Sequence, residues 1–237
     1  YDKLTMETVL LEDSQEVFED IMSEHFEETY YLLSGYEMKQ IVQFYTYIQE
    51  GGIDLPNTNE ETLYSNRYYP TKRLNKQQLI EIYDKYETYK LIKSKMDFTD
   101  FIMKFKNLLL TDDHMRKRVQ TAYQFIISDE HQDQSPTFIE IEKLIAGDTN
   151  KMKAMGDSDQ TLFNFRGIET YNMLEFKNHY KNSVVTTLSY NMRCPAKIVD
   201  ISNNLIQNNK LRYEKYLYGI EKPHYLEMLE ISNKYDV

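Results

Sequence analysis

The apolar run at residues 123–128 constrains the fold most, because it ends abruptly in two adjacent carboxylates, Asp129 and Glu130. A short apolar run of this kind predicts a buried β-strand. In open α/β sheets, ligands bind at the carboxyl ends of the strands, where such acids are presented. The segment therefore predicts an α/β fold in which Asp129 and Glu130 face a ligand.

Composition agrees with a globular protein. Apolar residues make up 41% of the chain, which is enough to build a core, and no uninterrupted stretch approaches the ~18 apolar residues of a membrane span. The N-terminus lacks the basic and apolar regions of an export signal. The single cysteine, Cys194, excludes an internal disulfide framework and multi-cysteine metal sites. We therefore expect a cytoplasmic protein without redox chemistry.

The net charge of −10 argues at first against a nucleic-acid partner, because neutralising phosphates needs Lys and Arg. The charge is unevenly distributed, however. Residues 1–64 hold 15 acids and two bases, whereas the remainder holds 23 acids and 26 bases. The first quarter of the chain would repel a polyanion, and the rest can host a local basic groove.

Residues 7–50 place apolar side chains at helical spacing, which predicts two helices, and Gly51-Gly52 and Pro56 end this pattern. A further helix is predicted over 75–93. We therefore expect the first 95 residues to be all-helical. The side chains predicted to point inward are Val9, Val17, Phe18, Ile21, Met22, Met38, Ile41, Val42, Tyr45, Ile48, Leu79, Ile82, Tyr83, Tyr86 and Tyr89.

Strands and helices are predicted to alternate after Met96. Ser135 and Pro136 are a good N-cap and first-turn pair, and Gly147 is a good helix stop. The elements expected are helices near 98–110 and from Thr111, a strand over 123–128, a helix over 136–146, strands over 151–155 and 184–188, and a helix from Pro195 through Leu205. The inner face of this last helix is predicted to hold Ile198, Ile201, Leu205 and Ile206.

The acid pair suits nucleotide hydrolysis. One carboxylate can hold Mg²⁺, usually through water because this ion dehydrates reluctantly, and its neighbour can orient and deprotonate an attacking water. On their own, two adjacent acids are more often solvated loop residues. His131, which follows the pair, is expected to be a packing residue rather than a metal ligand.

Two later segments strengthen the case for a nucleotide site. They are residues 156–167, Gly-Asp-Ser-Asp-Gln-Thr-Leu-Phe-Asn-Phe-Arg-Gly, and residues 189–195, Ser-Tyr-Asn-Met-Arg-Cys-Pro. With residues 129–133, they resemble motifs II, III and IV of the UvrD/Rep/PcrA-like superfamily 1A DNA helicases. In that family, motif III reads approximately Gly-Asp-x-x-Gln-Ser-Ile-Tyr-x-aromatic-Arg-Gly. This chain matches it at Gly156, Asp157, Gln160, Arg166 and Gly167.

The resemblance implies roles for the hydrolytic residues. Asp129 would hold Mg²⁺ through water, Glu130 would be the general base, and Gln160 would sense the γ-phosphate of ATP. A glutamine amide suits this last task, because it can both donate and accept hydrogen bonds. In motif IV, Arg193 would reach the γ-phosphate as an arginine finger from the second motor domain. Met192 stands where the family has a Tyr that stacks on adenine, and its thioether can still pack on a ring.

The resemblance also implies a DNA contact. Phe163, Phe165 and Arg166 would link the nucleotide cleft to DNA, since stacking of a base on an aromatic ring is worth ~1–3 kcal/mol and is indifferent to sequence. The alternative for Phe163 and Phe165 is that both side chains belong to the core.

A domain organisation follows from the same resemblance. Residues 96–100, Met-Asp-Phe-Thr-Asp, resemble the Asp-Phe-x-Asp segment that leads from the helical insertion of these helicases back into the first motor domain. The expected fold is a partial RecA-like parallel sheet of the P-loop NTPase type, preceded by an all-helical insertion. We expect residues 1–95 to form a 1B-like insertion, 96–180 the C-terminal part of domain 1A, and 181–237 the beginning of domain 2A.

No P-loop (Walker A) is present, because none of the seven glycines is followed by Lys. The later motifs of the family are also missing after Arg193. We therefore expect a fragment of an ATP- and Mg²⁺-dependent helicase, inactive by itself, whose parent acts on single-stranded DNA or a single-strand/double-strand junction. A nuclease or repair protein is a candidate partner.

Two other classes of function stay open. The chain could be a non-catalytic DNA-binding or assembly module on a helicase scaffold, as in helicase–nuclease complexes. Retention of the predicted hydrolytic side chains speaks against that module. A metal-dependent nuclease is a weaker alternative, because the acids outside these motifs lack convergent spacing.

Overall fold

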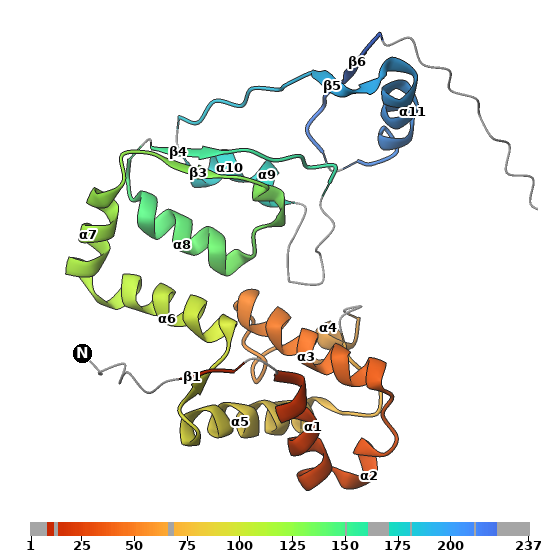
Figure 1. Cartoon of the computed structure of the whole chain (residues 1–237), viewed down its shortest axis with the longest axis vertical. Helices are drawn as coiled ribbons and strands as arrows, with labels where there is room; N and C mark the ends of the chain where they lie inside the picture. The colour runs from red at the N-terminus through yellow and green to blue at the C-terminus, as the bar shows by residue number, and fades with distance from the viewer. Residues whose placement is uncertain are drawn as a thin grey trace, which may run out of the picture. The chain divides into compact units, whose positions relative to one another are not determined.

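A computed structural model describes residues 9–11, 14–65, 69–149, 151–160, 171–180, 182–210 and 212–221 (Figure 1). The chain divides into two compact units, residues 1–183 and residues 184–237. No helix in the described part of the chain is long and apolar enough to cross a membrane.

The first unit begins with a helical region, coloured red to yellow in Figure 1. Its helices are α1 (Ser14–His25), α2 (Glu27–Tyr30), α3 (Gly35–Glu50), α4 (Glu60–Ser65) and α5 (Lys76–Ile92). Local sequence sets the starts of α3 and α5, because the N-cap residues Ser34 and Asn75 each form a reciprocal capping box with the residue three positions later. The helix predicted over 75–93 is confirmed, and residues 7–50 are helical as predicted, although they hold three helices rather than two because the short α2 separates α1 from α3.

Apolar and aromatic side chains close the core of the helical region. The ring of Phe18 stacks on Tyr45 at 5.1 Å and on Tyr86 at 4.2 Å between centroids. Of the side chains predicted inward, Val42, Tyr83 and Tyr89 are partly buried against the core and Val9 lies outside the described side chains. The others are buried as predicted: Val17, Phe18, Ile21, Met22, Met38, Ile41, Tyr45, Ile48, Leu79, Ile82 and Tyr86.

The prediction that the first 95 residues are all-helical is wrong in one detail. Two short strands precede and follow the helices in the sequence, β1 (Val9–Leu10) and β2 (Lys95–Met96), and they pair with each other in parallel. The pairing continues where Leu11 N donates to Met96 O at 2.8 Å. Such a pairing joins segments far apart in sequence, and local helical periodicity does not reveal it.

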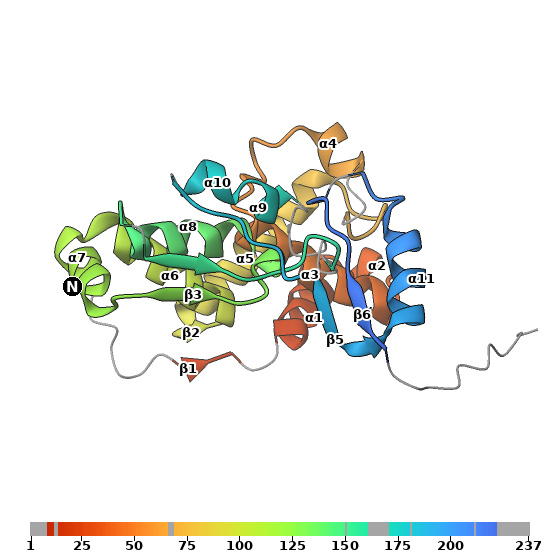
Figure 2. The ribbon, with the colours of Figure 1, turned by 90° about the horizontal axis from the view of Figure 1, so that it is seen from above.

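The remainder of the first unit has mixed helices and strands. It contains α6 (Phe98–Thr111), α7 (Asp113–Ala122), β3 (Ile126–Ser128), α8 (Pro136–Ala146), β4 (Met152–Ala154), α9 (Tyr171–Leu174) and α10 (Phe176–His179). Strands β3 and β4 are parallel, with Ile126 opposite Met152. Figures 1 and 2 both show α8 running alongside this strand pair. The predicted α/β class is therefore confirmed.

Element boundaries in this region follow local signals. Ser135 caps α8 by accepting from Phe138 N, and Gly147, at φ +58°, ends it, so the helix predicted over 136–146 is confirmed. The strand predicted over 123–128 starts later, at Ile126. The reason is that α7 continues to Ala122 and Tyr123 is its C-cap.

The second unit contains β5 (Tyr190–Pro195), α11 (Ala196–Ile206) and β6 (Tyr218–Ile220), and β5 and β6 are parallel. The strand predicted over 184–188 is wrong. Ladder pairing begins only at Tyr190, opposite Tyr218, and Val184 and Leu188 are each 87% exposed. A strand needs a hydrogen-bonded partner as well as apolar residues. Among the described residues, β6 pairs with residues 190–195 and not with residues 184–188.

The prediction of which face of α11 points inward is also wrong. Ile198, Ile201 and Leu205 are exposed, whereas Val199 and Asn203 are buried. The side chain of Asn203 donates to Leu217 O at 2.8 Å and accepts from Leu217 N at 3.2 Å. These two hydrogen bonds hold the Asn203 face of α11 against the segment that leads into β6.

Candidate active site

The predicted acid pair lies at the carboxyl end of β3, where Asp129 and Glu130 are both exposed. The backbone of Glu130 adopts a left-handed conformation, at φ 48° and ψ 40°, which residues other than glycine rarely adopt. It turns the chain from β3 into the 3₁₀ turn His131–Asp133. The turn is held to the next strand, because His131 N donates to Met155 O at 2.9 Å. A strained residue at a strand end is typical of functional sites.

Gln132 connects motif II to motif III. Its side chain is buried, at 2% exposure. The amide Nε2 donates to Glu130 Oε2 at 2.7 Å, and Oε1 accepts from Asp157 N at 3.0 Å. One amide therefore joins the predicted general base to the start of the segment that carries the predicted phosphate sensor.

Gly156 allows this close approach. A Cβ atom at position 156 would lie 2.4 Å from Gln132 Oε1 and 3.3 Å from Gln132 N. Both distances are shorter than ordinary contacts, so any side chain at this position would displace the buried amide. The glycine of motif III is thus explained by packing against motif II.

Gln160 lies at the far end of the same hydrogen-bonded chain. Its Nε2 donates to Asp157 Oδ2 at 3.0 Å, and its backbone N donates to Asp157 O at 2.9 Å. The structure therefore links Glu130 to Gln160 through Gln132 and Asp157. The roles of Glu130 and Gln160 in hydrolysis stay predictions, as does that of Asp129.

His131 packs beneath the turn. It is fully buried, and its ring lies edge-on to Phe176 with 5.5 Å between centroids. Its Nδ1 is 3.0 Å from Ser128 Oγ and 3.3 Å from Glu142 Oε2. Its Nε2 has no hydrogen-bond partner among the residues that the structure describes. These contacts tie the turn to β3, α8 and α10.

Burial favours the uncharged forms of two titratable side chains beside the turn. Burial, together with the neighbouring charge of Lys143, lowers the pKa of His179, and the Glu175 carboxylate opposes this shift. Burial also raises the pKa of Tyr180 to about 12.

The surroundings of Asp129 fit a magnesium ion held mainly by its substrate. Among the described residues, no group of three His, Cys, Asp or Glu side chains is arranged to hold a metal. Mg²⁺ in nucleotide sites is usually held by one or two carboxylates, water and substrate phosphates, so a single exposed carboxylate is sufficient. Asp129 meets this requirement, because within the described part of the chain its Oδ1 accepts only from the adjacent Glu130 N.

Arg193 and Met192 belong to the second unit, where both are exposed on β5. The side chain of Asn191 shapes this strand, because its Oδ1 accepts from Arg193 N at 2.9 Å and from Cys194 N at 2.8 Å. The approach of Arg193 and Met192 to a nucleotide stays a prediction. Phe163, Phe165 and Arg166 lie outside the described residues, and so their contact with DNA also stays a prediction.

The segment 96–100 forms a buried ionic junction. The Lys90 side chain, 3% exposed, pairs with Glu87 at 2.8 Å, Asp97 at 3.1 Å and Asp100 at 2.8 Å. Burial alone would lower the pKa of Lys90, but hydrogen bonds to Asp100 and Glu87 raise it overall. Asp97 also caps α6. The junction thus fastens α5 to the start of α6.

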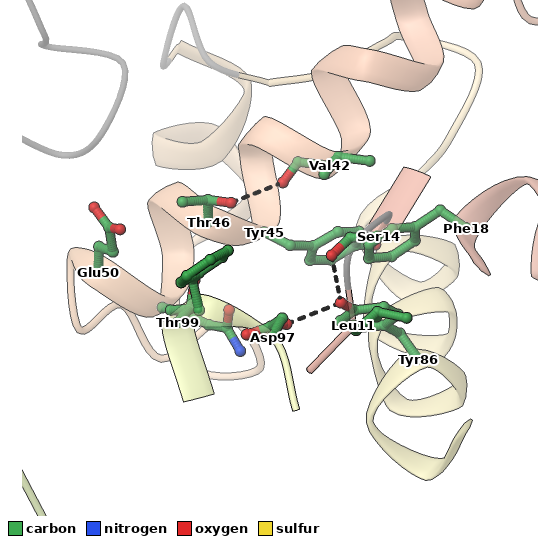
Figure 3. A pocket seen from close by; sticks show the side chains of 12 residues that line it. Leu11, Ser14, Phe18, Val42, Tyr45, Thr46, Glu50, Tyr86, Asp97 and Thr99 are labelled. Atoms are coloured by element: carbon green, nitrogen blue, oxygen red, sulfur yellow. Dashed lines mark hydrogen bonds between the residues drawn. The ribbon is translucent and has the colours of Figure 1, made fainter. Parts of the chain in front are cut away.

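A half-open hollow of about 360 Å³ lies beside this junction, lined by residues of α1, α3 and α5 and of the start of α6. The hydroxyl of Tyr86 is hydrogen-bonded to Ser14 Oγ at 2.9 Å and to Asp97 Oδ2 at 2.8 Å (Figure 3). None of the predicted site residues that the structure describes lines this hollow. It is therefore distinct from the candidate active site.

Comparison with known proteins identifies the class of protein that this fold and site define. Residues 1–181 match the family model of the UvrD/REP helicase N-terminal domain. Because this match covers more than half of the chain, the chain belongs to the UvrD/REP helicase family. The resemblance inferred from the motifs is confirmed.

Individual relatives agree with this assignment. The chain is 26% identical over 213 residues to a probable DNA helicase II homolog of Mycoplasma capricolum, covering 83% of this chain and 29% of the relative. It is 30% identical over 157 residues to the ATP-dependent DNA helicase PcrA of Staphylococcus aureus, covering 65% and 22%. It is 29% identical over 137 residues to the DNA helicase II of Rickettsia typhi, covering 58% and 21%. The chain thus spans less than a third of the length of these relatives.

Proposed function

We propose that these residues form the hydrolytic part of an ATP-dependent DNA helicase that couples ATP hydrolysis to movement on single-stranded DNA. The single observation that carries the proposal is the hydrogen-bonded chain from Glu130 through Gln132 and Asp157 to Gln160. A strained base at a strand end, joined to an exposed amide, supplies the groups that nucleotide hydrolysis requires. Membership of the UvrD/REP family supports the same function.

Within this function, each side chain has a distinct task. Glu130 orients and deprotonates the attacking water, and Gln160 contacts the γ-phosphate or that water. Asp129 holds Mg²⁺ through water, and the ion when bound neutralises phosphate charge. Arg193 stabilises the charge that develops on the γ-phosphate, because a guanidinium is permanently charged and matches phosphate geometry.

The remaining proposals concern nucleotide and DNA binding. Met192 packs on the nucleotide base, and Phe163, Phe165 and Arg166 contact single-stranded DNA or a junction. The names of the relatives, which are DNA helicases, support the DNA partner. In this assignment residues 1–95 are the 1B-like insertion, 96–180 the C-terminal part of domain 1A, and 181–237 the start of domain 2A.

The direct test is Glu130→Gln in the intact protein. We expect turnover of ATP to fall by ~10²–10⁴-fold, the usual contribution of a general base, while nucleotide binding stays near the wild-type value. Asp148→Asn, which alters an exposed acid next to Gly147, is the control and should leave turnover unchanged. Unaltered turnover in Glu130→Gln would reject the role of Glu130 as base, whereas absence of ATP turnover in the unmutated intact protein would favour a non-catalytic DNA-binding or assembly module.

A second test uses the 237-residue chain alone. Without P-loop contacts, we expect weak nucleotide binding and negligible Mg²⁺-dependent ATP hydrolysis. The measurement is phosphate release from purified protein with and without single-stranded DNA. Sustained, Mg²⁺-dependent release that disappears in Glu130→Gln would show that the chain needs no P-loop and would overturn this part of the proposal.

A further inference from the structure

We infer that Gln132 is a positioning residue, which fixes the carboxylate of Glu130 and ties it to the segment carrying Gln160. The inference rests on the proposed hydrolytic function. Gln132 itself is buried, so it acts on the reaction through Glu130 and Asp157 rather than by touching substrate.

The chemistry of the contact requires an amide. Gln132 donates from Nε2 to Glu130 Oε2 and, at the longer distance of 3.5 Å, to Asp133 Oδ2, and it accepts at Oε1 from Asp157 N. An ionised glutamate at this position could accept from Asp157 N but could not donate to Glu130, and a methionine has no donor and only a weak acceptor. Because the amide is buried, loss of the short bond to Glu130 or of the bond from Asp157 N would weaken the hydrogen bonding of a polar group that water does not reach.

Packing prevents the amide from moving away. Gly156 lies against Gln132 so closely that a Cβ atom there would be 2.4 Å from Oε1 and 3.0 Å from Met173 Sδ. On its other side, Gln132 belongs to the 3₁₀ turn, whose first residue is hydrogen-bonded to Met155 O. The side chain therefore holds one position between the turn and the backbone of residues 156–157.

The hydrogen bond leaves one oxygen of the base available. Gln132 occupies Glu130 Oε2, and among the described residues no other side chain bonds to that carboxylate. The second oxygen, Oε1, is free to accept a proton from water. Gln132 thus orients the carboxylate, and the left-handed backbone of Glu130 places it at the strand end. Misplacement of a catalytic group by ~1 Å can lower a rate by ~10²-fold, so this orientation matters for turnover.

The same amide connects two sides of the site. A shift of the Glu130 carboxylate would pull on Gln132, and through it on the Asp157 backbone that anchors Gln160. Residues 161–167, which carry the predicted DNA contacts, follow Gln160 directly. Gln132 is therefore placed to couple the hydrolytic base to the DNA-contacting segment.

The experiment compares Gln132→Met and Gln132→Glu in the intact protein. For Gln132→Met, we expect kcat for ATP to fall at least ~10-fold, with KM within ~2-fold, because orientation is lost and substrate contacts are kept. Gln132→Glu keeps the acceptor for Asp157 N but not the donor to Glu130, and it should also lose kcat. Gln124→Met, which removes an exposed amide before β3, is the matched control and should keep wild-type kcat.

A double-mutant cycle separates positioning from general stability. If Gln132 acts through Glu130, Gln132→Met should have little further effect on the single-turnover rate of Glu130→Gln. Equal losses in both backgrounds would overturn the inference, as would wild-type kcat in Gln132→Met. So would a loss of kcat that only matches a loss of folded protein, followed by thermal unfolding.

The outcomes distinguish this inference from the proposed function. Unaltered turnover in Glu130→Gln would reject the role of Glu130 as base within the proposed function. A collapse of turnover in Glu130→Gln, with normal kcat in Gln132→Met, would reject the positioning role alone.

Discussion

The helical region and the α/β region of the first unit are held together in different ways. In residues 14–92, apolar and aromatic side chains close a core around Phe18, Ile41 and Leu79. In residues 98–180, Phe125 and Ile127 of the strand segment are 78% and 62% exposed, whereas polar His131 and Gln132 are buried. The α/β region also buries some apolar side chains, such as Ile139, but the larger apolar cluster is that of the helical region. The chemistry of the site depends instead on polar links in the α/β region.

The sharpest way to break this comparison is to remove one aromatic ring from each region. Phe18→Ala should lower the free energy of unfolding by ~3–5 kcal/mol, because it leaves a cavity in the helical core. Phe125→Ala, the matched change at an exposed ring, should cost no more than ~0.5 kcal/mol. Urea unfolding followed by circular dichroism measures both. Equal losses would contradict the division between the regions.

The next largest effect is expected at the ionic junction. Lys90→Met should destabilise the fold by ~3 kcal/mol, because it leaves partly buried carboxylates without their cation. Lys85→Met removes a lysine that pairs with Glu81 at 3.7 Å on the same helix, and it should cost less than ~1 kcal/mol. The measurement is the same unfolding series. A small effect at Lys90 would mean that the junction adds little to the attachment of α5 to α6.

The smallest effect is expected at the cap of α3 and depends on pH. Hydrogen bonds from the Ser34 backbone and from Thr71 lower the pKa of Glu37 from 4.5 to about 2. A lowered pKa means that the stabilisation is present above pH 4.5 and is lost as the pH falls towards 2. Glu37→Gln should therefore cost ~1 kcal/mol at neutral pH and progressively less as the solution is acidified.

The control for this prediction is Glu28→Gln, at an exposed acid of α2. It should change stability by no more than ~0.5 kcal/mol at neutral pH. Stability curves at several pH values between neutrality and pH 3 provide the measurement. A difference between wild type and Glu37→Gln that stays constant over this range would show that the capping box does not depend on the charge of Glu37.

The sequence predicted those elements whose signals are local. As expected, α8 begins after its N-cap Ser135 and ends at Gly147, and the spacing of apolar residues identified the buried faces of α1, α3 and α5. Non-local pairing caused the errors. The strand expected over 184–188 failed because the ladder with β6 begins at Tyr190. The face of α11 was misassigned because the Asn203 hydrogen bonds to Leu217 outweigh the apolar spacing.

The candidate site was predicted in the same uneven way. Asp129, Glu130 and Gln160 could be selected from motif spacing, and the structure connects Glu130 to Gln160. The bridging role of Gln132 could not be predicted, because its partner Asp157 lies 25 residues further along the chain. The sequence signal for this contact is the glycine at position 156, since a glycine near a strand end permits another side chain to pack closely on the backbone, as Gln132 does.

We propose that Glu130 and Gln160 serve one triphosphate site, with Gln132 holding the base in place. The most direct measurement is a crystal structure of the intact protein with Mg²⁺ and a non-hydrolysable ATP analogue. We predict that both side chains lie at the γ-phosphate and that Gln132 still donates to Glu130. A triphosphate bound elsewhere, or one from which Glu130 and Gln160 point away, would contradict the proposal.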